Sequence, residues 1–370
     1  MRISNTLHLG IKELRGLGRD PMLIFLIVYA FTLSIYTAST AVPETLNNAA
    51  IAVVDEDQSP VSSRILTAFY PPYFSPPKLI SQYEMDRRMD AGLDTFAIDI
   101  PPNFQRDLLG GKSPTIQLNV DATRMTQAFN GSSYIQSILS SEVSEFVRRH
   151  RGSTSLPVDL AMRTKFNQEL NRAWFGAVTN VIFSTTILSI ILTGAALIRE
   201  REHGTIEHLL VMPVTPTEIM LSKIWSMGVV VLTATAFSLV FVVQGALDVQ
   251  IHGSLLLFLT GAALHLFATT SLGIFLATIS GSMPQFGMLL ILVLLPLQVL
   301  SGGLTPRESM PQFIQDIMLA APNTHFVMLA QSVLFRGAGL GIVWPQLVAL
   351  LTIGIVFFLF SLRRFRAFLR

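Results

Sequence analysis

Charged side chains gather in one short stretch between two long apolar runs, "IREREHGTIEHLLVMPVTPTEI", from Ile198 to Ile219. Two of its members are histidines, and zinc proteases place two histidines four residues apart on one helix face. Here His203 and His208 are five residues apart and no third ligand is evident, which disfavours a metal site. A charged surface that contacts another protein is the better interpretation. The candidate contact residues are Arg199, Glu200, Arg201, Glu202, His203, Glu207 and His208.

The rest of the chain offers no catalytic constellation. No GxxxxGK[ST] phosphate loop occurs, no GxGxxG follows a strand-like run, and no GxSxG nucleophile motif is present. The sequence contains no cysteine, which excludes thiolate chemistry and cysteine-ligated metals. The chain is therefore not predicted to be an enzyme, and no cofactor or metal ion is expected to bind it.

Polar side chains are rare within the apolar runs. No carboxylate lies there, although ion-driven carriers usually place Asp or Glu in the middle of the membrane. The central ionisable residue is His265. Neutral polar groups accompany it, and the candidate path residues are Asn180, His265, Thr269, Gln285 and Gln298. These groups either hydrogen-bond between helices or line a substrate path, and the sequence leaves both interpretations open.

The amino-acid composition of the whole chain indicates a membrane protein. Of 370 residues, 51% are hydrophobic and 14% are charged, with a mean hydropathy of +0.53, whereas soluble domains are about a quarter charged. The net charge of +2 gives no reason to expect a nucleic-acid partner. Five windows lack Asp, Glu, Lys and Arg: residues 21–43, 173–198, 224–247, 249–306 and 337–362.

The fourth window is long enough for two spans, so the sequence predicts six transmembrane helices of about 20 residues each. Ser280, Gly281 and Pro284 supply the turn between the fourth and fifth helices. The spans are expected near residues 22–42, 174–198, 225–247, 255–279, 284–302 and 342–362. We expect the first to be an uncleaved anchor, because its apolar run is longer than that of a usual signal peptide.

Lys and Arg are distributed unevenly around these spans. Both terminal tails are basic, and Arg199, Arg201 and Lys223 lie between the second and third spans. The opposite short segments carry only Arg307 and Arg336. Because cytoplasmic segments of membrane proteins have an excess of Lys and Arg, both termini and the charged stretch are predicted to be cytoplasmic, in a bacterial inner (plasma) membrane.

The expected organisation is a helical membrane protein with a large inserted α+β domain. Strand-like runs ("AAIAVVD", "DTFAIDIP", "TIQLNVD") alternate there with helix signals, among them Ser59 as N-cap before Pro60. The predicted parts are an amphipathic lead-in helix (1–20), a first transmembrane helix (21–42), an extracytoplasmic, periplasmic domain (43–172), and transmembrane helices two to six (173–370) with a cytoplasmic coupling loop (199–224) and a re-entrant outer hairpin (304–336).

Two boxes share one helix-start pattern: "TPTE" at Thr215–Glu218 and "TPRE" at Thr305–Glu308. Each offers a Thr N-cap, Pro at the first helical position and Glu three residues after the cap. The first is predicted to begin the helix that leads into the third span. The second is predicted to begin an amphipathic helix of the outer hairpin, which Pro311 and Pro322 interrupt.

A membrane protein without an ion-coupling carboxylate or its own ATPase, but with a charged cytoplasmic loop, is suited to a separate motor that pushes on that loop. The chain resembles the membrane subunit of an ABC exporter of the type-two permease family, within the YhhJ-like permeases. Four segments carry the resemblance: "IREREHGTIEHLLVMPVTPTEIMLSKIWSM" (198–227), "LPLQVLSGGLTPRESMPQ" (295–312), "PPNFQRDLLGGK" (101–112) and "VDATRMTQAFNG" (120–131). In this family the first segment corresponds to the coupling helix that docks on the nucleotide-binding subunit.

The resemblance implies a permease that forms the translocation path for export while a partner ATP-binding-cassette ATPase binds ATP and Mg. It also implies a second permease copy or homologous permease, a periplasmic membrane-fusion adaptor and an outer-membrane channel. A small hydrophobic or amphipathic substrate is expected, with drug efflux favoured over lipid or polysaccharide export. The rival hypothesis is a non-transporting receptor or mechanotransmitter that signals from its external domain. An intramembrane enzyme is a third hypothesis, for which no catalytic residues were found.

Overall fold

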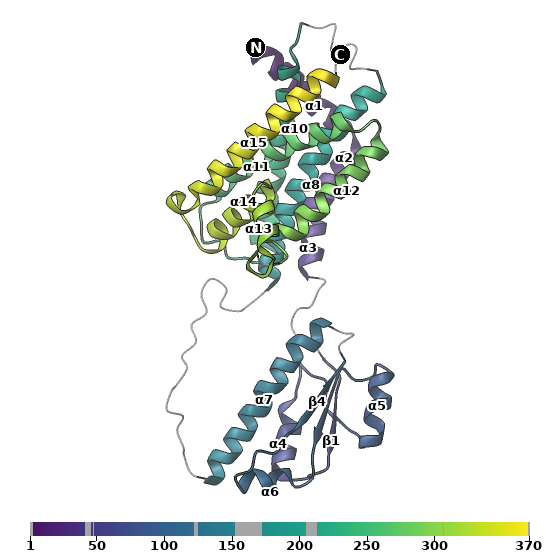
Figure 1. Cartoon of the computed structure of the whole chain (residues 1–370), viewed down its shortest axis with the longest axis vertical. Helices are drawn as coiled ribbons and strands as arrows, with labels where there is room; N and C mark the ends of the chain where they lie inside the picture. The colour runs from purple at the N-terminus through teal and green to yellow at the C-terminus, as the bar shows by residue number, and fades with distance from the viewer. Residues whose placement is uncertain are drawn as a thin grey trace. The chain divides into compact units, whose positions relative to one another are not determined.

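The computed structural model describes residues 3–40, 46, 48–121, 125–151, 172–204, 213–305 and 307–368. The chain divides into two compact units, Met1–Ala41 with Thr164–Arg370, and Val42–Arg163. The first is built of helices and the second contains the sheet (Figure 1). Each unit has its own hydrophobic core.

Six helices in the described part of the first unit are long and apolar enough to cross a membrane, and they match the six predicted spans. Two of them are composite: α2 (Pro21–Phe31) is followed by α3 (Leu33–Thr40), and α10 (Pro216–Phe237) continues as the π-helix η1 (Ser238–Ala246). The other four are α8 (Arg172–Glu202), α11 (Leu255–Ile279), α12 (Met283–Leu300) and α15 (Leu340–Phe368). The break at Thr32 was not predicted, since neither Gly nor Pro marks it.

Helices α8 and α11 form the centre of this unit, and α11 also packs against α15. Most of α8 is buried, whereas few residues of α12 and α15 are buried. Close approach of α8 to α11 depends on Gly273, where an added Cβ would lie 2.7 Å from the carbonyl oxygen of Ile190. Small residues at helix interfaces permit such contacts in membrane proteins, where packing rather than water exclusion drives association.

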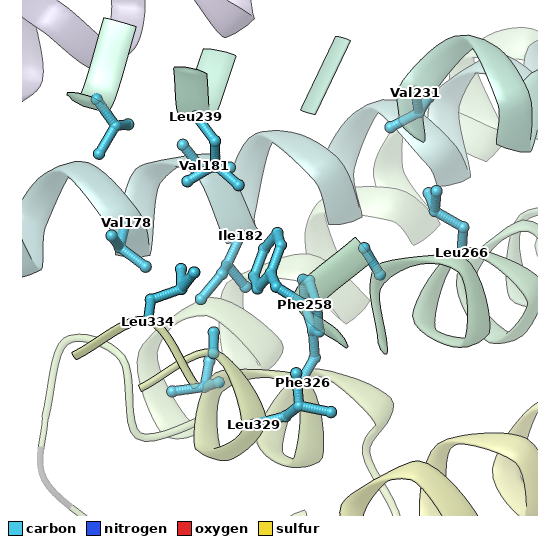
Figure 2. Close-up of a cluster of buried hydrophobic side chains, with 14 of the residues drawn as sticks. Val178, Val181, Ile182, Val231, Leu239, Phe258, Leu266, Phe326, Leu329 and Leu334 are labelled. Atoms are coloured by element: carbon cyan, nitrogen blue, oxygen red, sulfur yellow. The ribbon is translucent and has the colours of Figure 1, made fainter. Parts of the chain in front are cut away.

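The main core of the unit joins most of its helices (Figure 2). Aliphatic side chains of α8 meet aromatic and aliphatic side chains of α10, η1, α11 and α14 (Pro322–Ala330). Labelled members of this cluster are Val178, Val181, Ile182, Val231, Leu239, Phe258, Leu266, Phe326 and Leu329. The rings of Phe258 and Phe326 are 5.5 Å apart. This core fixes α14 against the spans.

The segment after α12 folds as a bent helical pair. Helix α13 (Gln312–Met318) and α14 continued by the π-helix η3 (Gln331–Phe335) meet at an angle of 93°. By length and composition the pair counts either as a seventh, broken span or as a re-entrant loop. The predicted helix start at Thr305 is wrong: only a 3-10 turn, Arg307–Ser309, occurs there, and α13 begins after Pro311. A proline at 311 lacks the N–H that a helix begun at Thr305 would require.

Helix α1 (Ile3–Gly18) covers most of the predicted lead-in segment and packs against α10. The contact is close, because an added Cβ at Gly10 would collide with the Trp225 ring, whose Nε1 donates to the Thr6 carbonyl at 3.1 Å. Side chains of Ile3, Leu7 and Ile11 remain exposed on α1. An exposed apolar stripe of this kind is typical of a helix that lies on a membrane surface.

The second unit contains a four-stranded sheet in the order β2-β1-β3-β4. Strand β1 (Ile51–Asp55) pairs in parallel with β2 (Lys78–Leu79) and with β3 (Phe96–Ile100), and β4 (Gln117–Val120) is antiparallel to β3. In the register, Ile51 lies opposite Phe96, and Phe96 lies opposite Val120. The three predicted strands therefore correspond to β1, β3 and β4.

Helices cover both faces of this sheet. Helices α4 (Pro60–Ala68), α6 (Phe104–Leu109) and α7 (Met125–Arg151) pack on the face that contains Phe96, Ile98 and Ile100, and α5 (Gln82–Asp90) packs on the other face. As predicted, Ser59 caps α4 before Pro60, and its hydroxyl accepts from the Ser62 N–H. Arg64 of α4 donates to Glu142 of α7 at 2.7 Å. This pair ties the two helices together.

Candidate functional site

Polar side chains meet between α8, α11 and α14, inside the apolar core. The Thr186 hydroxyl lies 2.9 Å from His265 Nε2 and 2.6 Å from Asn323 Oδ1. Asn323 Nδ2 donates to the Leu297 carbonyl at 3.2 Å, which adds α12 to the network. The His265 ring stacks on Phe326 with centroids 4.3 Å apart. One threonine therefore joins three elements of the unit.

Further hydroxyl contacts extend the network along α8. Ser189 donates to Thr269 of α11 at 2.7 Å, and Thr185 contacts Thr235 of α10 at 2.9 Å. All four of these side chains are buried. Hydroxyls of Thr and Ser satisfy their remaining hydrogen-bonding capacity on carbonyls of their own helix, as Thr185 does on Val181. The spans can therefore bury these groups without leaving them unpaired.

A small cavity adjoins the network at α12. It is lined by Phe183, Thr186, Leu297, Gln298 and Asn323, among others, and has a volume of about 10 Å³. That space holds roughly one water molecule. In this conformation the network is enclosed by side chains, so a substrate could reach it only after the helices separate.

The five predicted path residues fall into three groups. His265 and Thr269 are buried in the network. Gln298 lines the adjoining cavity, and Asn180 is half-buried on α8. Gln285 is exposed near the start of α12, where its side chain accepts from the Gly281 N–H at 2.7 Å. The structure therefore brings His265, Thr269 and Gln298 together and places Gln285 elsewhere.

A second polar site lies at the end of α8. Glu200 Oε2 is 2.8 Å from Lys223 Nζ of α10, and the same ammonium is 3.0 Å from Glu13 of α1. Lys12 reaches Glu200 at 3.3 Å from the exposed side. The Lys223 side chain is only 2% exposed. A buried cation between two carboxylates holds α1, α8 and α10 together at this end.

Arg199 makes a separate ion pair with the residue that precedes α2. Its Nη1 lies 2.9 Å from Asp20 Oδ2, and Asp20 also caps α2 by accepting from the Leu23 N–H. The Leu23 N–H bond, followed by the Arg199 guanidinium, lowers the pKa of the Asp20 carboxyl below its usual value. A cavity of about 300 Å³ lies between this pair and the Glu200 cluster, lined in part by Leu17 and His203.

The other predicted contact residues come directly after Glu200 in the sequence. Arg201 donates to the Ser280 carbonyl at 3.1 Å, and Glu202 accepts from the Met283 N–H at 3.0 Å. His203 is exposed after the end of α8. Glu207 and His208 lie outside the described residues. The end of α8 thus contacts the turn between α11 and α12, which links the charged stretch to two further spans.

Sequence reasoning missed several members of both sites. Thr186, Ser189 and Asn323 were not singled out, and Glu13 was not connected to the charged stretch. The spacing of Thr185, Ser189 and Thr193 at four-residue intervals was a usable signal, because it places three hydroxyls on one helix face. No comparable signal existed for Glu13, since its partners are far away in the sequence.

These helices belong to a membrane permease, because the chain is a member of the ABC-2 transporter family. The family model described as "ABC-2 family transporter protein" matches residues 21–363. Its members are membrane permeases that work with an ABC ATPase. The match includes both units of the structure.

Individual relatives agree with this assignment. The chain is 59% identical over 98% of its length to the inner membrane transport permease YhhJ of Escherichia coli K12, covering 97% of that protein. It is 26% identical over 92% of its length to the probable multidrug ABC transporter permease YbhR of the same strain, covering 93% of that protein. For the probable multidrug ABC transporter permease YbhS the identity is 27%, over 89% of this chain and 88% of the relative.

Proposed function

We propose that this chain forms the translocation path of an ABC exporter and couples ATP hydrolysis by a separate nucleotide-binding subunit to export of a small hydrophobic or amphipathic substrate. The network centred on Thr186 carries the proposal. It concentrates buried hydroxyl, imidazole and amide groups at the junction of α8, α11, α12 and α14. Hydrogen bonds of this kind can be exchanged between partners when helices move, at modest cost in a membrane.

The coupling proposal rests on the end of α8. The predicted contact stretch begins where Arg199 and Glu200 are held by ion pairs to α1, α10 and the residue before α2. A force applied to the stretch would therefore reach three other elements. Glu200 is buried in this structure, so we assign it to transmission within the permease and assign docking on the ATPase to the residues that follow it.

Topology and further partners are part of the same proposal. Both termini and residues 199–224 are placed in the cytoplasm, and residues 43–172 in the periplasm, on the distribution of Lys and Arg. Helix α12 exposes Met288, Ile291, Leu292 and Leu295. Lipid or a second permease copy would cover this apolar surface. A periplasmic adaptor and an outer-membrane channel would complete an envelope-spanning pump.

Drug efflux is the favoured transport activity, because two relatives carry the name of probable multidrug permeases. The spans present few polar groups and no carboxylate in the network, which suits an uncharged or weakly cationic amphipathic compound better than an anionic polymer. Lipid and polysaccharide export remain the alternatives that transport assays would distinguish.

The test is transport in proteoliposomes that contain the permease and its ATPase. We expect ATP-dependent movement of at least one amphipathic dye from a panel, and none with an ATPase variant that cannot hydrolyse ATP. A receptor or mechanotransmitter would give no ATP-dependent flux with any compound. Flux of an isolated lipid or oligosaccharide without dye transport would replace the drug assignment and keep the export assignment.

A further inference from the structure

A polar cavity of about 530 Å³ lies at the junction of the loop after α12 with α14, η3 and the start of α15. It contains Arg307 and Arg336. These are the two basic residues in the short segments that are predicted to lie on the side of the membrane opposite the cytoplasm. Its volume falls within the roughly 300–1,000 Å³ of small-molecule sites. Neither the network at Thr186 nor the ion cluster at Glu200 includes any of these groups.

Arg307 is positioned for a ligand on its guanidinium. Its side chain packs against the turn at Gly302, where an added Cβ would lie 3.1 Å from Arg307 Cγ. One nitrogen, Nη1, contacts the Met328 sulfur at 3.1 Å, and the buried Nε has no hydrogen-bond partner among the described residues. The Gln346 Oε1 in the same cavity is likewise buried without a donor. Buried polar atoms left in this condition are costly unless a ligand or water satisfies them.

The charges define the ligand class. Two guanidinium groups are suited to bidentate recognition of a phosphate group. Glu308 also lines the cavity, and its carboxylate would repel a simple anion while attracting an ammonium group. A phosphate ester that carries an ammonium on a short chain satisfies both charges at once.

The surroundings of the cavity favour a lipid as the source of that group. Leu304 and Ile342 line the cavity and are largely exposed; Trp344, two residues after Ile342 on α15, does not line the cavity but is also largely exposed. Exposed apolar chains beside a polar cavity match the two ends of a phospholipid, and Trp is enriched where headgroups meet hydrocarbon. We propose that this cavity binds the phosphoethanolamine group of a membrane phospholipid, with its phosphate on Arg307 and Arg336 and its ammonium on Glu308.

The test measures the lipids that the purified full chain retains. The protein is incubated in detergent with equal amounts of phosphatidylethanolamine, phosphatidylglycerol and diacylglycerol, and the complexes are counted by native mass spectrometry. We expect preferential retention of phosphatidylethanolamine and about tenfold weaker retention by Arg336→Gln, the loss expected for one charged hydrogen-bonding partner. Glu308→Gln should abolish the preference over phosphatidylglycerol while phosphate-bearing lipid is still bound.

The matched control is Arg364→Gln, which removes an exposed guanidinium from the other end of α15. Arg336 is itself exposed, so its variant is expected to fold even if Arg307→Gln does not. Displacement by soluble phosphoethanolamine would assign recognition to the headgroup alone, and retention that requires acyl chains would assign it to the intact lipid. Equal retention by Arg336→Gln and the unaltered protein, or equal retention of diacylglycerol, would overturn the proposal.

Discussion

At the scale of single residues, burial rather than polarity separates the candidate path residues. Both His265 and Gln285 are polar residues within apolar windows, yet the first is buried in a network and the second is exposed. The sequence predicted that polar groups would occur in the spans. It could not tell which of them face another helix, because that depends on the rotation of each helix, and spans that are apolar all round carry no periodic signal of their orientation.

His265→Gln tests whether the imidazole acts as a proton relay. Glutamine keeps an N–H donor near the position of Nε2, so the contact with Thr186 can persist, and no carboxylate partner for His265 occurs in the described parts of the spans. We expect ATP-dependent transport to stay within a few fold of the unaltered protein after correction for expression. Thr186→Val, which leaves two partners without their hydroxyl, should reduce stability by about 1–3 kcal/mol. Complete loss of flux in His265→Gln with intact assembly would contradict this expectation and favour a proton-relay role for the ring.

Lys223→Met tests the buried ion cluster. It leaves the carboxylates of Glu13 and Glu200 near each other without their buried cation, and breaking such a buried pair costs about 3–5 kcal/mol. Lys12→Met is the matched control, because the Lys12 side chain is 57% exposed and should contribute less than about 1 kcal/mol. Thermal unfolding of both variants in detergent measures the difference. Equal, small shifts in melting temperature would mean that water reaches the cluster.

At the scale of elements, the two Thr-Pro boxes show what a local pattern can predict. Thr215 caps α10 as expected, and the Glu218 carboxylate accepts from the Thr215 N–H at 2.8 Å. The box at Thr305 has the same residue types but begins no α-helix. A cap stabilises a helix by only about 1 kcal/mol, whereas Pro311 imposes a larger penalty, so the sequence downstream of the box decides the outcome.

Gly10 provides a prediction about the contact of α1 with α10. Gly10→Val would force a side chain into the Trp225 ring, so we expect α1 to separate from α10. Gly16→Val lies on the same helix and meets no atom within 4 Å, which makes it the matched control. Because the chain has no cysteine, one cysteine introduced in α1 and one in α10 across this interface report the contact by crosslinking. Crosslinking that survives in Gly10→Val would show that the helix can shift without separating.

At the scale of the whole molecule, the chain divides into two compact units. Uncharged windows on each side of a hydrophilic segment predicted an inserted domain, and the structure has a compact unit at Val42–Arg163. The sequence of this segment predicts strands and helices, because the elements that cover the faces of a small sheet are amphipathic and therefore have a periodic apolar pattern. Local patterns could not predict contacts between elements that are distant in the sequence, such as the ion pair of Glu13 with Lys223.

Residues 43–172 expressed alone should be soluble and unfold cooperatively, with stability that depends on acidic pH. Backbone and side-chain bonds from Ser81 lower the pKa of Glu84, and Lys112 lowers the pKa of Asp107. A carboxyl whose pKa is lower in the folded state stabilises that state above its unfolded pKa, about 4, and loses this contribution as pH falls through the folded value. Melting temperatures should therefore be constant above about pH 5 and fall below about pH 4. An aggregated fragment without a transition would place the domain boundary elsewhere.

The last prediction concerns binding of the ATPase to the charged stretch that follows α8. We expect Glu202→Lys and Glu207→Lys to keep membrane insertion and the fold of the inserted domain while the ATPase is released or uncoupled. Glu202 lies where α8 ends against Met283, and Glu207 follows in the charged stretch. Losing a buried, hydrogen-bonded charge at an interface costs about 2–5 kcal/mol of association, whereas a change on a solvated loop costs under about 0.5 kcal/mol.

The two outcomes differ by more than tenfold in binding, which co-purification of the ATPase with the permease can detect. Asp316→Lys, a charge reversal on α13 outside the predicted contact, is the control and should retain the ATPase. Because Glu202 also accepts from the Met283 N–H, its variant alone could act through α12, and Glu207 supplies the independent change. Full ATPase binding and full efflux in both reversals would exclude this stretch as the coupling element and leave the ion cluster at Glu200 with a structural role.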